Sequence, residues 1–130
     1  MSASGDTDPA ANGEAVQAAR AFLAAGVPVA AICGATAGLA RAGLLDDRAH
    51  TSSAREYLLY GTGYAGADLY RDEPVVVDNG LITAGPTHPV EFARAVFEEL
   101  GVFAPEVLDA WYRLFGEHDP SAYAVLAGSV

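Results

Sequence analysis

Cys33, the one cysteine in the sequence, stands in the surroundings expected of a nucleophile. It follows an apolar run that ends at Ile32, and the small residues Gly34 and Ala35 come directly after it. A buried strand, a sharp turn and a small-residue helix in this order are typical of a nucleophile elbow, whose strained turn exposes the side chain. The start of that helix favours a thiolate, and its backbone N–H groups suit an oxyanion. The alternative is a core cysteine that packs as a small hydrophobe.

His50 is the candidate base for this thiol. It qualifies if the short strand expected over Ala49–Ser52 turns its side chain towards Cys33, because a shift of one residue would turn it to the opposite face. The alternative is a surface or core histidine. His88 and His118 lie too far along the chain to give a metal-ligand spacing with it, so we expect no metal site and no cofactor.

The composition limits the partners of the protein. In 130 residues there are seven basic side chains, all arginine, against seventeen acidic ones, for a net charge of −10. This balance argues against nucleic acid and against anionic membranes. The acidic residues predict a solvated surface, with Asp72 and Glu73 as candidates to line a pocket. A lone cysteine fits the reducing cytoplasm.

No membrane span or leader is expected. The uncharged stretch over Ala21–Ala40 is long enough to cross a bilayer. Gly26 and Pro28 interrupt it, however, and a helix end followed by a buried strand explains it better. The first residues lack the basic and apolar regions of a signal peptide.

The elements that must position these residues alternate between helices and short strands, which predicts a single α/β layered domain over residues 1–130. Asn79-Gly80 between two apolar runs predicts a hairpin, because a type I′ turn needs positive φ at both positions. The expected elements are a helix from Asn12 to Gly26, a strand over Val27–Ile32, a helix over Gly34–Gly43, a short strand over Ala49–Ser52, a helical turn over Glu56–Tyr60, strands over Val75–Asp78 and Leu81–Ala84, helices over Pro89–Leu100 and Pro105–Phe115, and a last helix from Asp119.

Two segments resemble the ThiJ/PfpI family, also called DJ-one/PfpI, of the class I glutamine amidotransferase-like superfamily. PVAAICGATAGLARAGLLDDRAHTS looks like the family's elbow region, and DEPVVVDNGLITAGPTHPVEFARAVFEEL resembles its closing hairpin and helix. The resemblance covers a core of about residues 12–100. It implies a flavodoxin-like three-layer sandwich with a mostly parallel sheet, usually dimeric, with the elbow Cys33 as the reactive centre.

The sequence departs from the family pattern in ways that affect the site. The domain resembles one shortened at its N-terminus, without the first strands and without the Glu that contacts the cysteine in relatives. Ser4-Gly5-Asp6 resembles the end of the family's Gly-Gly segment, so Gly5 and Gly34 are implied as backbone donors to an oxyanion. Some members carry His directly after the cysteine, where Gly34 stands. Others carry it about twenty residues on, where Thr51, Ser52 and Ser53 stand. The base would then be His50 or a residue from another chain.

Residues 102–130 form a C-terminal helical extension beyond the core and carry a rich apolar surface. We expect it to pack on the protein itself and to share in a homodimer, so that its deletion causes aggregation. Two functions compete. Cys33 either attacks small carbonyl or amide substrates, in a deglycase-, glyoxalase- or hydrolase-like reaction, or belongs to a non-catalytic or redox-responsive relative that acts as a dimerising module.

Overall fold

A computed structural model describes residues 12–128 of the chain. It contains short strands and helices in the alternating order that the sequence predicts. The elements are α1 (Gly13–Ala24), β1 (Val29–Ile32), α2 (Ala35–Arg41), α3 (Arg55–Leu59), η1 (Ala67–Leu69), β2 (Val75–Asp78), β3 (Leu81–Ala84), α4 (Pro89–Leu100), α5 (Pro105–Phe115), η2 (Pro120–Ala122) and α6 (Tyr123–Gly128).

The three strands form one sheet in the order β1-β3-β2. β1 runs parallel to β3, and β2 runs antiparallel to it. The predicted hairpin is confirmed, since Asn79 and Gly80 both take positive φ, at 46° and 80°. A two-residue turn can only return the chain antiparallel. The sheet described here is therefore mixed, whereas the sequence led us to expect a mostly parallel one.

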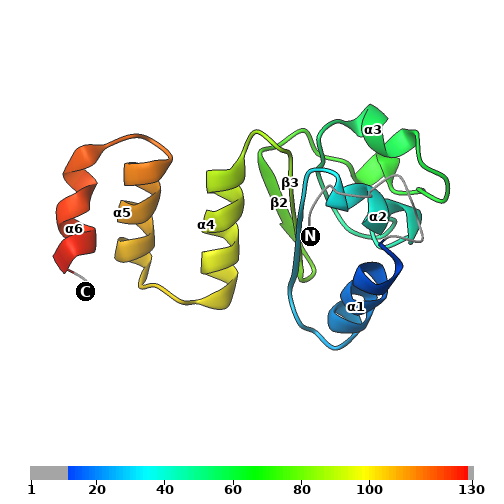
Figure 1. Ribbon diagram of the computed structural model, residues 1–130, viewed down its shortest axis with the longest axis horizontal. Helices are drawn as coiled ribbons and strands as arrows, with labels where there is room; N and C mark the ends of the chain where they lie inside the picture. The colour runs from blue at the N-terminus through cyan, green and yellow to red at the C-terminus, as the bar shows by residue number, and fades with distance from the viewer. Residues whose placement is uncertain (1–11, 129–130) are drawn as a thin grey trace.

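Helices cover both faces of the sheet, as Figure 1 shows. α4 packs against the strands from one side, and α1 and α2 pack against β1 from the other. All six residues from Ala35 to Ala40 are buried. Five of them are small and let α2 approach the sheet closely, and the sixth, Leu39, fills the core together with Leu45 and Leu81, all three with no exposed surface. This layering fixes where β1 ends and α2 begins.

The C-terminal helices continue the stack outward from α4 (Figure 1). α5 packs against α4, and α6 packs against α5. Phe97 of α4 meets Phe103 and Trp111 edge to face, with ring centroids 5.3 Å and 5.2 Å away. The extension thus packs on the protein itself, through α4 and not on the sheet.

One expected strand is nearly absent. Ala49–Ser52 forms only an isolated parallel bridge, between His50 and Tyr70. At this bridge the His50 N–H donates to the Leu69 carbonyl at 3.3 Å and the His50 carbonyl accepts from the Arg71 N–H at 2.8 Å. The residues on either side of His50 are held by side chains, because Asp78 accepts from the Ala49 N–H at 2.7 Å and Thr83 accepts from the Thr51 N–H at 2.9 Å. A segment held in this way is free to leave the regular alternation of a strand.

Candidate functional site

Cys33 occupies a strained turn between β1 and α2. Its φ is 58°, in the left-handed region that a non-glycine residue rarely adopts. The Cys33 N–H donates to the carbonyl of Ala84 at 3.0 Å, which extends the β1–β3 pairing to the turn itself. Such strain persists only where the surroundings determine the backbone fully, and it is concentrated at functional sites.

The buried hydroxyls of Thr36 and Ser52 hold the backbone of this turn through hydrogen bonds. Thr36 Oγ1 lies 2.6 Å from the Cys33 carbonyl oxygen and 2.7 Å from Ser52 Oγ. The carbonyl can only accept, so the single proton of the Thr36 hydroxyl goes to it, and Ser52 is the donor to Thr36. The backbone of Cys33 is therefore tied to the segment that contains Ser52, sixteen residues beyond Thr36.

The Cys33 side chain is half-buried and touches Ser53. The Ser53 hydroxyl donates towards the sulfur, with Oγ 3.9 Å from Sγ. Ser53 itself is exposed and stands twenty residues after the cysteine. Ser53 lies in the region where some family members carry a histidine, but it was not among the site residues expected from the sequence. The signal that could have found it was a polar Thr-Ser-Ser run at that distance.

His50 is fully buried in a separate cluster of rings. Its Nδ1 lies 2.7 Å from the Arg48 carbonyl oxygen, and its Nε2 lies 2.7 Å from the Tyr64 hydroxyl. Because the carbonyl only accepts, Nδ1 carries the proton and Nε2 accepts from Tyr64. The rings of Tyr64 and Tyr70 both meet the imidazole edge-on.

Burial lowers the pKa of His50, and the hydrogen bond to Arg48 and the charge of Asp46 oppose this only in part. The imidazole is therefore neutral near pH 7. With both nitrogens engaged, it presents no free nitrogen to Cys33 in this arrangement. The role of His50 as the base stays a prediction from the sequence.

Of the two residues expected to donate to an oxyanion, Gly34 and Gly5, the structure describes only Gly34. Gly34 is buried and directly precedes α2, with φ −60° and ψ −24°. Its role as a backbone donor to an oxyanion stays a prediction from the sequence. Gly5 lies outside the described residues.

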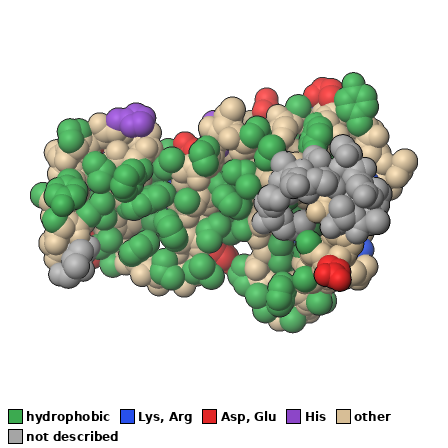
Figure 2. All heavy atoms as spheres, viewed as in Figure 1, with side chains coloured by type: hydrophobic (Ala, Val, Ile, Leu, Met, Phe, Trp, Pro, Cys, Tyr) green, Lys and Arg blue, Asp and Glu red, His purple; other side chains and the backbone are tan. Residues whose placement is uncertain are grey.

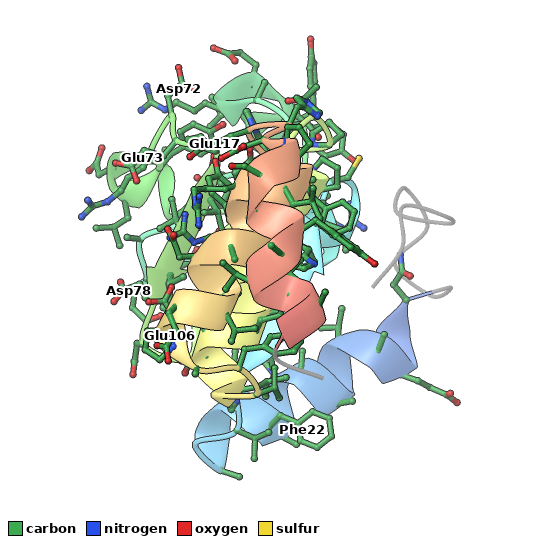
Figure 3. All side chains as sticks on the ribbon, turned by 90° about the vertical axis from the view of Figure 1, so that its left-hand side faces the viewer. Phe22, Asp72, Glu73, Asp78, Glu106 and Glu117 are labelled. Carbon is green, nitrogen blue, oxygen red and sulfur yellow. The ribbon has the colours of Figure 1, made fainter. Side chains whose placement is uncertain are left out.

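Two cavities adjoin Ser53. The larger, of about 600 Å³, is enclosed in part by α3 and η1. The smaller, of about 230 Å³, lies between the Thr51–Ser53 segment and the residues that follow β3. Ser53 and Asp72 line both cavities, and Glu73 joins Asp72 in the smaller one. Figure 3 shows Asp72 and Glu73 at one end of β2, with Asp78 at the other. Asp72 and Glu73, the two acidic residues expected to line a pocket, thus both line the smaller cavity.

Within residues 12–128, no group of three or more histidine, cysteine, aspartate or glutamate side chains is arranged to hold a metal ion. None of the helices in that range is both long enough and apolar enough to cross a bilayer.

The fold and the cysteine turn define an α/β protein of the flavodoxin-like class. The family model described as "DJ-1/PfpI family" matches residues 3–99. The chain belongs to the DJ-1/PfpI family.

Two curated relatives come from Bacillus subtilis (strain 168). The chain is 40% identical over 109 residues to the uncharacterized protease YoaZ, and the matched residues cover 83% of this chain and 52% of that protein. It is 32% identical over 83 residues to the uncharacterized protease YdeA, covering 64% of this chain and 42% of that one. The chain spans about half the length of these relatives.

Solved structures give the same assignment. A thiJ/pfpI family protein from Bacillus anthracis superposes with a TM-score of 0.86 at 38% identity, over 92% of this chain and 57% of that one. A DJ-1 superfamily protein from Agrobacterium tumefaciens gives 0.64 at 38% identity, over 71% and 50%. The fold class and the family expected from the sequence are confirmed.

Proposed function

We propose that Cys33 is the nucleophile of an enzyme that acts on small carbonyl or amide compounds. The observation that carries the proposal is the positive φ of Cys33, 58°, at a strand-to-helix turn, with its sulfur half-exposed and in contact with a hydroxyl donor. A non-glycine residue kept in a strained turn on the protein surface is more readily explained by its chemistry than by packing. Family membership supports the same reading.

In the proposed reaction the Cys33 thiolate adds to the carbonyl carbon and forms a C–S bond, while the π electrons move to oxygen. The backbone N–H of Gly34, with Gly5 as a second donor, stabilises that oxyanion. With an aldehyde the product is a hemithioacetal once the oxygen is protonated. With an amide the adduct expels the amine, which takes a proton from water, and a thioester remains for hydrolysis. The word protease in the names of the Bacillus subtilis relatives supports the amide branch.

The experiment is a turnover screen of small aldehydes and amides with the purified chain and two variants. Cys33→Ser removes the thiol, and Ser121→Ala is a matched surface change in η2, where the hydroxyl binds only Asp119. We expect Cys33→Ser to lower turnover at least 100-fold and Ser121→Ala to leave it unchanged. Equal turnover in wild type and Cys33→Ser would exclude Cys33 as the nucleophile.

A second function rests on the engagement of both His50 nitrogens away from the thiol. A thiol without a placed base suits a redox-responsive, non-catalytic role. Peroxide titration followed by mass spectrometry separates the two functions. Selective oxidation of Cys33 without turnover of any compound in the screen favours the redox role, and turnover that needs Cys33 favours the enzyme.

The proposal includes a cytoplasmic homodimer. Large apolar side chains stay exposed along the C-terminal helices, and Figure 2 shows hydrophobic atoms over α4, α5 and α6. Those most exposed there are Leu100, Val102, Phe103, Phe115, Tyr123 and Val125. A contiguous patch of this kind favours association. Sedimentation should show a dimer that Phe115→Glu dissociates, and a monomeric wild type would remove the dimer from the proposal.

A further inference from the structure

The hydroxyl of Ser53 is placed to donate a hydrogen bond to the Cys33 sulfur. It lies 3.9 Å from Sγ and is the side-chain donor that the structure records there among residues 12–128. Ser53 also lines both cavities described above, whereas Cys33 lines neither of them. Ser53 is therefore the residue that both contacts the sulfur and lines the cavities.

The backbone that carries Ser53 is held firmly from two directions. A Cβ on Gly85 would stand 2.9 Å from the Ser52 carbonyl oxygen and 3.9 Å from the Ser53 Cα, so the chain beyond β3 lies directly against this segment. On the other side, the buried Ser52 hydroxyl donates to Thr36 in α2. Ser53 is thus an exposed side chain on a fixed backbone.

The same end of β3 also fixes the cysteine. Ala84 accepts from the Cys33 N–H at 3.0 Å, and the next residue, Gly85, is the one that meets Ser52. Thr36 then joins the two sides through the Cys33 carbonyl and the Ser52 hydroxyl. The backbones of Cys33 and of the Ser52–Ser53 segment are therefore held relative to each other by a shared framework, and only the χ1 rotations of the two side chains decide whether the sulfur and the Ser53 oxygen meet.

We propose that Ser53 is a catalytic residue that donates a hydrogen bond to the Cys33 thiolate and so stabilises the charged sulfur without acting as a base. This inference rests on the proposed function in that Cys33 reacts as a thiolate. A serine hydroxyl keeps its proton at neutral pH, so it does not remove the proton of the thiol. That proton goes to water or buffer, and the Ser53 O–H then points at the negative sulfur, where a bond to a charged acceptor is stronger than a neutral one.

This arrangement predicts an effect that depends on pH. A hydrogen bond to a charged sulfur favours that form over the thiol but makes each thiolate a weaker nucleophile, because nucleophilicity falls as the thiolate is stabilised. The two effects offset each other in part at pH 7. At alkaline pH, where the thiol is ionised with or without the donor, only the second effect remains.

The test is the second-order rate of Cys33 alkylation by iodoacetamide, measured by mass spectrometry on the whole chain, which has one cysteine. We expect Ser53→Ala to react about threefold more slowly than wild type at pH 7 and no more slowly at pH 10. Ser53→Thr, which keeps the hydroxyl, should restore the wild-type rate at pH 7. Ser53→His supplies a true base and should exceed the wild-type rate at pH 7. Ser121→Ala is the matched control and should match wild type throughout.

Two results would overturn the proposal. One is an unchanged rate for Ser53→Ala at pH 7, and the other is an equal loss at both pH values, which would mark a change in access to the sulfur alone. Alkylation needs no turnover, so its outcome is separate from that of the substrate screen. A Ser53-dependent rate in a chain that turns over no compound would sustain the donor role while the proposed enzyme fails. Turnover that requires Cys33 but is unchanged in Ser53→Ala would support the proposed enzyme and contradict the role of Ser53.

Discussion

The strain at Cys33 predicts that replacing this residue by glycine stabilises the fold more than replacing it by alanine. Both substitutions remove the thiol, so the comparison isolates the backbone. Cys33 has φ 58°, and its N–H and carbonyl are both hydrogen-bonded, so the turn keeps this conformation whatever side chain it carries. Alanine must then pay the same steric penalty as cysteine, and glycine escapes it.

The magnitude follows from two opposing effects. A left-handed backbone costs an L-residue roughly 1–2 kcal/mol. Glycine loses more conformational freedom on folding than alanine, by about 0.5–1 kcal/mol. Cys33→Gly should therefore be more stable than Cys33→Ala by about 0.5–1 kcal/mol. In a domain of this size that difference raises the melting temperature by about 2–4 °C.

The assay is equilibrium unfolding in urea, followed by far-UV circular dichroism so that the whole chain reports. Ala93→Gly, in the middle of α4, is the matched control, because there the backbone is helical and glycine should destabilise by about 0.5–1 kcal/mol. If Cys33→Ala proves at least as stable as Cys33→Gly, the turn stores no strain. Backbone strain at Cys33 would then no longer indicate that the residue is kept for its chemistry.

Three further predictions concern the groups around the turn. Thr36→Val leaves the buried Ser52 hydroxyl without its acceptor, so we expect a loss of about 1–3 kcal/mol in urea unfolding. Because burial lowers the pKa of His50 below 6.5, its contribution to stability is full above pH 6.5 and is lost as the pH falls through the lowered pKa. His50→Gln should thus flatten the fall in stability between pH 7 and pH 5, which His118→Gln should leave unchanged. Gly85→Ala puts a methyl 2.9 Å from the Ser52 carbonyl oxygen, so it should cost about 1–3 kcal/mol and alter the alkylation rate of the cysteine.

Local signals in the sequence were enough for most of the fold. Asn79-Gly80 predicts its hairpin because positive φ at two successive positions is a requirement of the turn, independent of the rest of the chain. Pro89 and Pro105 start α4 and α5 where a first-turn proline predicts a helix start. Ala49–Ser52 was the exception. Among residues 12–128, only His50 of this segment forms backbone hydrogen bonds to a neighbouring segment, while the Ala49 and Thr51 N–H groups donate to the Asp78 and Thr83 side chains, which periodicity does not reveal.

For the candidate site, the sequence predicted the strand–turn–helix around Cys33 but not the side chain that contacts its sulfur. Cys33 sits in a strand–turn–helix whose small residues can be read directly from the sequence. The partner of the sulfur depends on which way an irregular segment faces. His50 turns into the core against Tyr64, and Ser53, three residues on, reaches the sulfur. From residue type alone, His50 was the expected partner of the sulfur. The path of the backbone brings Ser53 to the sulfur instead, and contacts with Gly85 and Thr36, outside the segment, hold that path.

These contacts also bear on the choice of substrate. Hydrolysing an amide requires expulsion of a poor leaving group, and enzymes lower such barriers by at least about 8 kcal/mol. A hydrogen bond to a charged group contributes only about 1.5–3 kcal/mol, and a serine donor cannot protonate the departing amine as a histidine would. An aldehyde needs no leaving group, since the thiolate adds and the oxygen is protonated from water.

Under the proposed function, a site with Cys33 as nucleophile and Ser53 as hydrogen-bond donor should therefore favour aldehydes over amides. In the turnover screen we expect small aldehydes to react in a Cys33-dependent manner and simple amides to give no thioester that mass spectrometry detects. Ser53→His should reduce the difference in reactivity between aldehydes and amides, because a histidine can protonate the departing amine. A wild-type chain that accumulates a thioester from an amide as readily as it converts an aldehyde would show that a base reaches the sulfur. In that case the residue to test is His50, released from Tyr64, or one from a second chain.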